Sequence, residues 1–339
     1  MRFIDFFAGI GGFRLGMEMA GHECVGHCEI DKFADKSYRS MHKVKENEWF
    51  ANDIARVKPE DLPEAECYCF GFPCQSFSIA GERGGFEDTR GTLFFEVMRL
   101  VKERKPEILF AENVRGLLNH DKGRTFGTII KTMDELGYSV EWQLYNSKYH
   151  VPQNRERVYI IGHFREGSPR KIFPIRGGDN KTAIVPGYQV LSNTIAAGDR
   201  QTNGTYPLSN GGVIKVNSYH KKTDKEIIQV GNIVDDTNRN FKNPQWGRIY
   251  SPEGISPCLS TMQGGKREPK IIDENGEEIR IRKLTPKECF RLQGFPDEYF
   301  ERAAKVNSDS QLYKQIGNSV TVPVIYEIAK RLKEGEANV

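Results

Sequence analysis

The sequence lacks three features: a strong net charge, a long apolar run and an internal repeat. Lys and Arg number 49 and Asp and Glu number 46 in 339 residues, so the net charge is only +3. This balance excludes a histone-like tail and an acidic disordered chain, but a local basic surface can still bind nucleic acid. No apolar run is long enough to cross a membrane, and the N-terminus MRFIDFFAGIGG lacks the layout of a signal peptide. We therefore expect a soluble globular protein.

Cysteine is also sparse. The chain has seven cysteines with no repeated spacing. The close pairs Cys24/Cys28 and Cys67/Cys69 lack the second pair that a zinc site needs. We expect no bound metal, free thiols and a reducing cytoplasm, in which one thiol can be reactive.

The first half of the chain alternates strand and helix patterns. Short apolar runs at residues 2–7, 66–72 and 108–111 are typical of buried parallel strands. Helical periodicity follows at residues 92–105 and 126–136. The alternation predicts an α/β fold, with a parallel sheet covered by helices on both faces.

The second half has a different character. From about residue 169 to residue 276 the chain is rich in Gly, Asn, Thr and Ser, with short β-like runs, which predicts a smaller, irregular, β-rich domain. Helical patterns return at 285–292 and 326–333, which indicates that the chain returns to the first domain. The expected division is 1–175, 176–282 and 283–339.

A glycine-rich segment, FAGIGG, follows the first strand and precedes a helix. Glycines there let the backbone approach a ligand, but Arg14 replaces the third glycine of a dinucleotide fingerprint. A nucleoside with an amino-acid tail fits equally well. Glu29 lies where an acid binds ribose hydroxyls, and Asp53 can accept from an adenine amino group. The alternative is a tight turn with solvent-facing acids.

Cys74 stands in the segment GFPCQS, after a buried strand whose carboxyl end opens onto a crevice. Pro73 sets the turn, and the positive charge of Arg155 and Arg157 would favour a nucleophilic thiolate. Glu112 leaves another apolar strand, where desolvation raises a carboxyl pKa enough for proton donation. The alternatives are a buried structural cysteine and a capping or ion-paired glutamate.

Together these groups indicate one reaction. A thiolate adds to an electron-poor ring carbon while an acid protonates the ring nitrogen, and the carbon made nucleophilic attacks a methyl group on the cofactor. A base then removes the ring proton and the thiolate leaves. Methylation at carbon 5 of a pyrimidine needs this sequence, because that carbon is unreactive by itself.

The chain resembles the cytosine-5 DNA methyltransferases of bacterial and phage restriction–modification systems. The matching blocks occur in order from residue 2 to residue 324 and include DFFAGIGGFRLG, GFPCQSFSIAG, FEDTRGTLFFE, ENVRGLL, QNRERVYIIG, RKLTPKECFRLQGFPD and QIGNSVTVPV. Only the middle region matches weakly, as is typical of a target-recognition domain. The resemblance implies a Rossmann-like sheet that binds S-adenosylmethionine and no metal.

The resemblance also implies residue roles. Cys74 would bond to carbon 6 of cytosine, Glu112 would contact N3 and the exocyclic amine, and Arg157 with Arg155 would hold the cytosine and its phosphate. The cofactor pocket would comprise Phe7, Gly9, Ile10, Gly11, Gly12, Glu29, Ile30, Asp53, Ile54, Pro73, Leu93, Asn318 and Ser319. The loop at residues 76–90 would close over DNA.

Two positions depart from the family pattern. Ile30 stands where an aromatic often stacks on adenine, so stacking would become aliphatic packing. Cys258 stands in place of the threonine of a Thr-Leu pair, which removes one expected hydroxyl contact to DNA.

The target carbon is hidden in a stacked duplex, so the enzyme must flip the base out, at a cost of about a few kcal/mol. Gln245 lies where related enzymes place an infiltrating glutamine, and Arg248 can donate to guanine O6 and N7 or bind a phosphate. Expected DNA contacts also come from Gln75, Ser78, Arg90, Ser260, Gly264, Gly265, Lys266 and Arg267.

The expected partners are double-stranded DNA and a restriction endonuclease that acts separately, and the expected state is a cytoplasmic monomer. A tRNA cytosine-5 methyltransferase and a non-catalytic DNA-binding regulator are the alternatives. The presence of Cys74 and Glu112 disfavours the second, and the large variable domain disfavours the first. Nothing in the sequence identifies the target site.

Overall fold

The computed structural model describes residues 1–72, 93–165, 172–173, 175, 204–207, 213–216, 226–232, 248–262, 268–275 and 278–334. The chain divides into two compact units. Unit 1 comprises Met1–Asn146, Glu156–Asp179 and Ser319–Val339, and unit 2 comprises Ser147–Arg155 and Asn180–Asn318. Unit 2 thus includes residues 147–155 and 283–318 as well as the predicted middle region. The functions assigned to these parts remain predictions.

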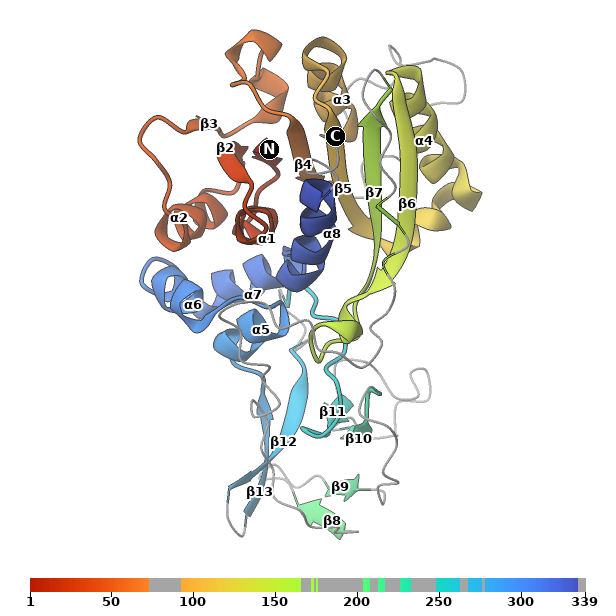
Figure 1. Cartoon of the computed structure of the whole chain (residues 1–339). Helices are drawn as coiled ribbons and strands as arrows, with labels where there is room; N and C mark the ends of the chain where they lie inside the picture. The colour runs from red at the N-terminus through yellow and green to blue at the C-terminus, as the bar shows by residue number, and fades with distance from the viewer. Residues whose placement is uncertain are drawn as a thin grey trace. The chain divides into compact units, whose positions relative to one another are not determined.

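Unit 1 is built on a seven-stranded sheet with the order β3-β2-β1-β4-β5-β7-β6 (Figure 1). Its strands are β1 (Arg2–Phe6), β2 (Glu23–Cys28), β3 (Trp49–Ala51), β4 (Cys67–Gly71), β5 (Ile108–Val114), β6 (Tyr138–Asn146) and β7 (Glu156–Phe164). The first five strands pair in parallel, whereas β7 runs antiparallel to both β5 and β6. The prediction of a parallel sheet is correct except at β7, because β6 and β7 are joined by a connection without the helical crossover that parallel strands need.

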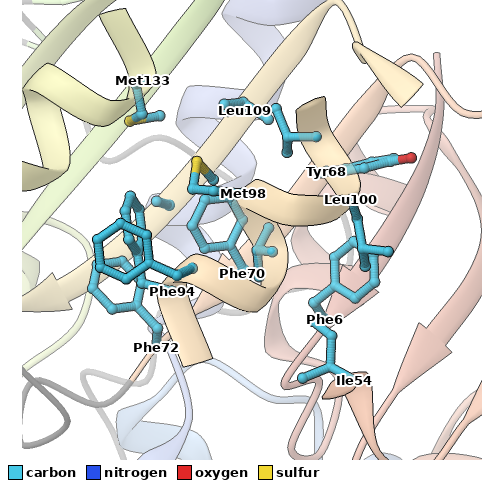
Figure 2. Close-up of a cluster of buried hydrophobic side chains, with 14 of the residues drawn as sticks. Phe6, Ile54, Tyr68, Phe70, Phe72, Phe94, Met98, Leu100, Leu109 and Met133 are labelled. Carbon is cyan, nitrogen blue, oxygen red and sulfur yellow. The ribbon is translucent and has the colours of Figure 1, made fainter. Parts of the chain in front are cut away.

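Helices cover both faces of this sheet, as predicted. They are α1 (Gly12–Met19), α2 (Lys32–Met41), α3 (Leu93–Arg104), α4 (Arg124–Glu135) and α8 (Val322–Glu334), with short 3-10 turns at Ile54–Arg56, Pro59–Asp61, Arg115–Leu118 and His120–Gly123. Alternate strand residues face opposite ways. Tyr68 and Phe70 pack with α3 and α4 (Figure 2), and Cys67 and Cys69 pack with α1 and α8.

Local sequence signals set several helix ends. Asp31 caps α2, because its carboxylate accepts from the backbone N–H groups of Phe33 and Ala34. Gly137 follows α4 with a φ of 93°, which is typical of a glycine after a helix C-terminus. Figure 1 shows α1 and α8 side by side, so the last part of the chain packs on the first helix.

Unit 2 is a mixture of short strands and helices. A four-stranded sheet has the order β10-β11-β12-β13, in which β11 and β12 pair in parallel, and β8 and β9 form a separate antiparallel pair. The elements are β8 (Gly204–Pro207), β9 (Val213–Val216), β10 (Gln229–Asn232), β11 (Arg248–Tyr250), β12 (Lys270–Asn275), β13 (Glu278–Lys283), α5 (Pro286–Leu292), α6 (Asp297–Ala304), α7 (Asp309–Asn318) and the 3-10 turn Ser147–Tyr149. A capping box between Thr285 and Glu288 starts α5.

None of the described helices is long and apolar enough to span a bilayer. Within the same residues, no group of three or more His, Cys, Asp or Glu side chains is arranged to hold a metal ion. The cysteines described by the structure carry free thiols.

Candidate active site

Glu112 and Arg157 form an ion pair at one end of the unit 1 sheet. Glu112 lies on β5 and Arg157 on β7, and the two strands are hydrogen-bonded neighbours. The Arg157 Nε atom is 3.0 Å from Glu112 Oε1, and the two side chains are only 13% and 11% exposed. The other carboxylate oxygen, Oε2, lies beside Gly71, the last residue of β4. The pair thus places a nearly buried carboxyl group and a guanidinium next to the end of β4.

The backbone that leads from β4 toward Cys74 is held by the residue after Glu112. Asn113 is buried, and its side-chain amide donates to the carbonyl oxygen of Phe72 at 2.7 Å. Its amide oxygen accepts from the Val114 N–H at 2.8 Å. Phe72 therefore has a set position two residues before Cys74, which itself lies outside the described residues. Sequence reasoning missed Asn113, and its place in the block ENVRGLL was the available signal.

The glycine-rich turn between β1 and α1 has a strained but well-supported backbone. Phe7, Gly9 and Gly11 have positive φ values of 55°, 56° and 78°. A positive φ at the non-glycine residue Phe7 costs free energy and is common at ligand sites. The Gly11 N–H donates to the Ala8 carbonyl at 2.8 Å and closes the turn. Among the residues that the structure describes, no atom other than those of its chain neighbours lies within 4 Å of a Cβ on Gly9, so these residues leave open space there.

Glu29 is hydrogen-bonded to this turn. Its Oε2 accepts from the Gly9 N–H at 2.7 Å, and its Oε1 accepts from the Asp31 N–H at 2.7 Å. Burial raises the pKa of Glu29, and the two backbone N–H groups oppose this rise. Each carboxylate oxygen has a second lone pair with which it can accept from a ligand hydroxyl.

The His42 side chain packs against the turn at residues 7–12 and was not predicted from the sequence. The imidazole is buried, and its Nε2 donates to the Ile10 carbonyl at 3.0 Å. Burial lowers the pKa of His42 to about 3, so the ring is neutral at physiological pH. A Cβ on Gly11 would overlap this ring and that of Tyr38. The glycine at position 11 is therefore required by packing as well as by φ.

The C-terminal segment of unit 1 meets the same turn. A Cβ on Gly12 would lie 2.7 Å from Ser319 Oγ, so the missing side chain lets residues 319–320 approach α1. The remaining predicted pocket residues of unit 1 have mixed environments. Ile30 is 75% exposed. Asp53 caps the Ile54–Arg56 turn, the Ile54 side chain lies in the core drawn in Figure 2, and Leu93 begins α3.

The predicted residues of unit 2 do not all face outward. Arg155 is buried and donates to the carbonyl oxygens of Leu259 and Gly317. Arg248 is the first residue of β11 and is half-buried, whereas Ser260 and Asn318 are exposed. The remaining predicted site residues, Pro73, Cys74, Gln75, Ser78, Arg90, Gln245, Gly264, Gly265, Lys266 and Arg267, lie outside the described residues.

A family model agrees with the resemblance seen in the sequence. The model for the C-5 cytosine-specific DNA methylases matches residues 1–334. The chain is 38% identical to the type II methyltransferase M.HhaI of Haemophilus parahaemolyticus, over 97% of this chain and 93% of that protein. It is 36% identical to the type II methyltransferase M.SsoII of Shigella sonnei, over 98% and 79%, and 33% identical to the orphan methyltransferase M.SPRI of Bacillus phage SPR, over 98% and 97%.

Solved structures share the fold. The Entamoeba histolytica methyltransferase EhMeth superposes with a TM-score of 0.67 at 17% identity, covering 99% of this chain and 98% of that one. A putative DNA modification methyltransferase encoded within an E. coli prophage gives 0.61 at 20% identity, covering 98% and 99%. The chain therefore belongs to the C-5 cytosine-specific DNA methylases and is a DNA (cytosine-5)-methyltransferase of the type found in restriction–modification systems.

Proposed function

We propose that this methyltransferase acts through a covalent bond between Cys74 and the target cytosine, with Glu112 and Arg157 as its partners. The observation that carries the proposal is the pairing of β4 with β5. Gly71 is in register with Glu112, and the Asn113 side chain donates to the Phe72 carbonyl. Cys74 comes two residues after Phe72, so in sequence it is close to the strand end beside which the Glu112 carboxyl group lies. Crevices in such sheets form at the carboxyl ends of the strands.

In the proposed reaction, Cys74, Glu112 and Arg157 each have a stated role. The Cys74 thiolate bonds to carbon 6 of cytosine while Glu112 gives a proton to N3, and Arg157 holds both the carboxyl group and the base. The bound cofactor supplies an electrophilic methyl group, which carbon 5 attacks. The demethylated cofactor is the leaving group of this transfer. A base then removes the proton from carbon 5, the bond to Cys74 breaks to regenerate the thiolate, and N3 returns its proton to Glu112. The ion pair with Arg157 limits the motion of the Glu112 carboxylate, which must first take up a proton to act as the acid at N3.

The overall activity has a direct test. Purified protein should transfer labelled methyl groups to duplex DNA and not to tRNA, and bisulfite sequencing of a host that expresses it should show one methylated cytosine within a short recurring sequence. Transfer to tRNA would instead favour the RNA branch of the family. Failure to methylate any DNA would favour a non-catalytic regulator.

Family membership implies S-adenosylmethionine as the methyl donor, and we propose that it binds over the turn at residues 7–12. The open space at Gly9 fits a ligand that contacts the backbone closely. Glu29 fits the ribose hydroxyls of this cofactor, because its oxygens retain lone pairs beside their backbone N–H donors. Ile30, which is exposed, would pack on the adenine.

We expect a Gly9→Ala variant to bind S-adenosylmethionine at least tenfold more weakly, which is about 1.4 kcal/mol. The added methyl group would extend into the space proposed for the cofactor, since the described part of the chain has no atom beyond the neighbouring residues within 4 Å of it. The φ of 56° adds a cost of about 1–2 kcal/mol to the free energy of folding. Titration calorimetry would measure the affinity and thermal unfolding the stability.

Gly127→Ala is the matched control. Gly127 lies on α4 and has no positive φ, and no described residue outside the backbone of α4 comes within 4 Å of an added Cβ. This variant should keep full affinity and be slightly more stable, because alanine favours a helix. Wild-type affinity in Gly9→Ala would exclude the turn as the cofactor site.

We expect an Asn113→Ala variant to transfer methyl groups about 10–100-fold more slowly. Loss of the amide removes the hydrogen bond to Phe72 and frees the backbone before Cys74, and small displacements of a reacting group are costly. Affinity for the cofactor should not change, because the Asn113 side chain is hydrogen-bonded to Phe72 and Val114 rather than to the turn at residues 7–12. Single-turnover kinetics would measure the rate, and a wild-type rate would show that the Phe72 contact has no role in catalysis.

Within unit 2 we assign the loop at residues 251–262 and Arg248 to DNA recognition, together with the predicted Gln245, Gly264, Gly265, Lys266 and Arg267. The weak family match in this part of the chain and its short strands favour the assignment. We also propose that the protein works as a cytoplasmic monomer beside a separate restriction endonuclease. Size-exclusion chromatography with light scattering tests the monomeric state. Protection of methylated DNA from host nucleases tests the presence of a separate restriction endonuclease.

A further inference from the structure

Two stretches of unit 2 that are about 100 residues apart in sequence lie side by side. Residues 152–155 run along residues 256–259 as a short parallel bridge between Gln153 and Ser256. The Ser256 N–H donates to the Pro152 carbonyl at 2.7 Å, and the Asn154 N–H donates to the Ser256 carbonyl at 2.8 Å. The first stretch precedes Arg157 directly, and the second belongs to the loop assigned to DNA recognition.

Arg155 lies at the end of this bridge and is only 2% exposed. Its Nη1 donates to the Leu259 carbonyl at 3.2 Å, and its Nη2 donates to the Gly317 carbonyl at 3.3 Å. One guanidinium thus binds the backbone of the recognition loop and the backbone at the end of α7. The planar fork of an arginine suits this task, because it directs separate N–H groups to separate acceptors.

Two buried glutamines extend the same network. Gln153 accepts from the Leu259 N–H at 3.4 Å and donates to the Leu292 carbonyl at 3.0 Å. Gln293 donates to the Ile316 carbonyl at 3.3 Å. Both glutamines are fully buried. We call Gln153, Arg155 and Gln293 the polar hub; each member binds backbone groups of a segment distant in sequence.

Gly317 brings the two segments held by Arg155 into direct backbone contact. A Cβ on Gly317 would overlap the Ser260 carbonyl. The end of α7 and the recognition loop can therefore keep this arrangement only with glycine at position 317.

The polar hub and its partners lie close in sequence to two points at which the chain passes from unit 2 to unit 1. Unit 2 ends its first stretch at Arg155 and its second at Asn318, the residue after Gly317. Two residues beyond Arg155 is Arg157, which pairs with Glu112. The residue after Asn318 is Ser319, whose hydroxyl lies against Gly12.

We propose that Arg155 is a positioning residue rather than a group that touches the cytosine or its phosphate. It holds the recognition loop and the end of α7 in one arrangement, so that DNA reading by this unit depends on the backbone contacts of Arg155. The inference rests on the proposed function of the loop at residues 251–262.

The test compares Arg155→Lys with Arg155→Ala in DNA-binding and methylation assays over a range of salt concentrations. Lysine keeps the positive charge and would preserve a phosphate contact, but it lacks the planar fork that spans two carbonyl groups. We expect both variants to show at least a tenfold higher KM for target DNA and poorer discrimination against a duplex with one altered base pair. For both variants, the slope of the logarithm of the DNA-binding constant against the logarithm of salt concentration should equal that of the wild type. A slope reduced by about one in Arg155→Ala, with wild-type behaviour in Arg155→Lys, would assign Arg155 to a phosphate and overturn the proposal.

Gly317→Ala tests the same arrangement without changing Arg155, and it carries the test if Arg155→Ala does not fold. Alanine favours a helix, yet we expect this variant to raise the KM for DNA and relax discrimination, because its methyl group displaces the Ser260 backbone. Wild-type KM and discrimination in Gly317→Ala would contradict the inference.

Arg302→Ala is the matched control, since Arg302 lies on α6 in the same unit and forms an ion pair with Glu298 one helical turn away. It should behave as the wild type. Measurements on the wild-type protein distinguish failure of the proposed function from failure of the role proposed for Arg155. If it forms no covalent adduct with DNA, the proposed function fails; if it does and Arg155→Lys is unchanged, only the role of Arg155 fails.

Discussion

A Cys74→Ala variant is expected to lose methyl transfer by about 10⁴-fold or more, the scale on which removal of a covalent nucleophile acts. Without the sulfur, no bond forms to carbon 6 of cytosine, and carbon 5 stays too unreactive to accept a methyl group. Affinity for S-adenosylmethionine should stay at the wild-type value, because the contacts proposed for the cofactor come from other residues, such as Gly9 and Glu29.

A trapping experiment separates loss of the nucleophile from loss of folding. Duplex DNA with 5-fluorocytosine at the target position should form a stable adduct with the wild-type protein, since fluorine cannot leave as a proton does. Denaturing gel electrophoresis would reveal the adduct as a band of increased mass. The Cys74→Ala variant should give no such band while it still binds the cofactor. An adduct in that variant would place the nucleophile elsewhere in the chain.

A Glu112→Gln variant is expected to slow methyl transfer by about 10²–10⁴-fold, which is the usual contribution of a positioned general acid. Glutamine has nearly the same shape, and its carbonyl oxygen can still accept from Arg157 Nε, which lies 3.0 Å from the glutamate oxygen. An amide is a poor proton donor, so the loss should appear in kcat rather than in stability or cofactor affinity. Single-turnover measurements on target DNA would report the chemical step.

Glu135→Gln is the matched control for this change. Glu135 ends α4 and pairs with Lys131 one turn before it, with both side chains largely exposed. Exposed pairs of this kind contribute about 0.3–0.5 kcal/mol, so methyl transfer should be unaffected. If Glu112→Gln reacted at the wild-type rate, Glu112 would have no part in proton transfer and Arg157 would be the sole remaining partner for the base.

The sequence pattern predicted the parts of the fold that depend on short-range periodicity. The strands β1, β4 and β5 are apolar on both faces, and this makes them visible as continuous runs bounded by turn residues. Strand β6 was missed, although apolar and polar residues alternate through YSVEWQLYN as is typical of a half-exposed strand, here at the edge of the sheet. Helices α6 and α7 were also missed, since their apolar residues are few and their burial comes from neighbouring helices.

In the candidate site, too, some residues were predicted from local sequence patterns and others were not. Glu29 was predicted from its spacing after the glycines to bind ribose hydroxyls, and this role remains a prediction; the structure adds that Glu29 accepts from the Gly9 N–H. Asn113 and His42 were not predicted, because a lone asparagine or histidine has no local pattern that identifies its partner. Arg155 was assigned to the substrate by its motif, whereas in the structure its Nη atoms donate to Leu259 and Gly317.

By itself, the sequence determined the alternating order of strands and helices, the glycine turn with its acid partner, and the family and its reaction. These are recorded in residue types at short separations, where covalent geometry and periodicity limit the possible structures. Only the tertiary structure decided the direction of β7, the ion pair of Glu112 with Arg157, and the backbone groups bound by Asn113, His42 and Arg155. A buried polar side chain must find a partner inside the protein, and which partner it meets depends on how distant segments pack.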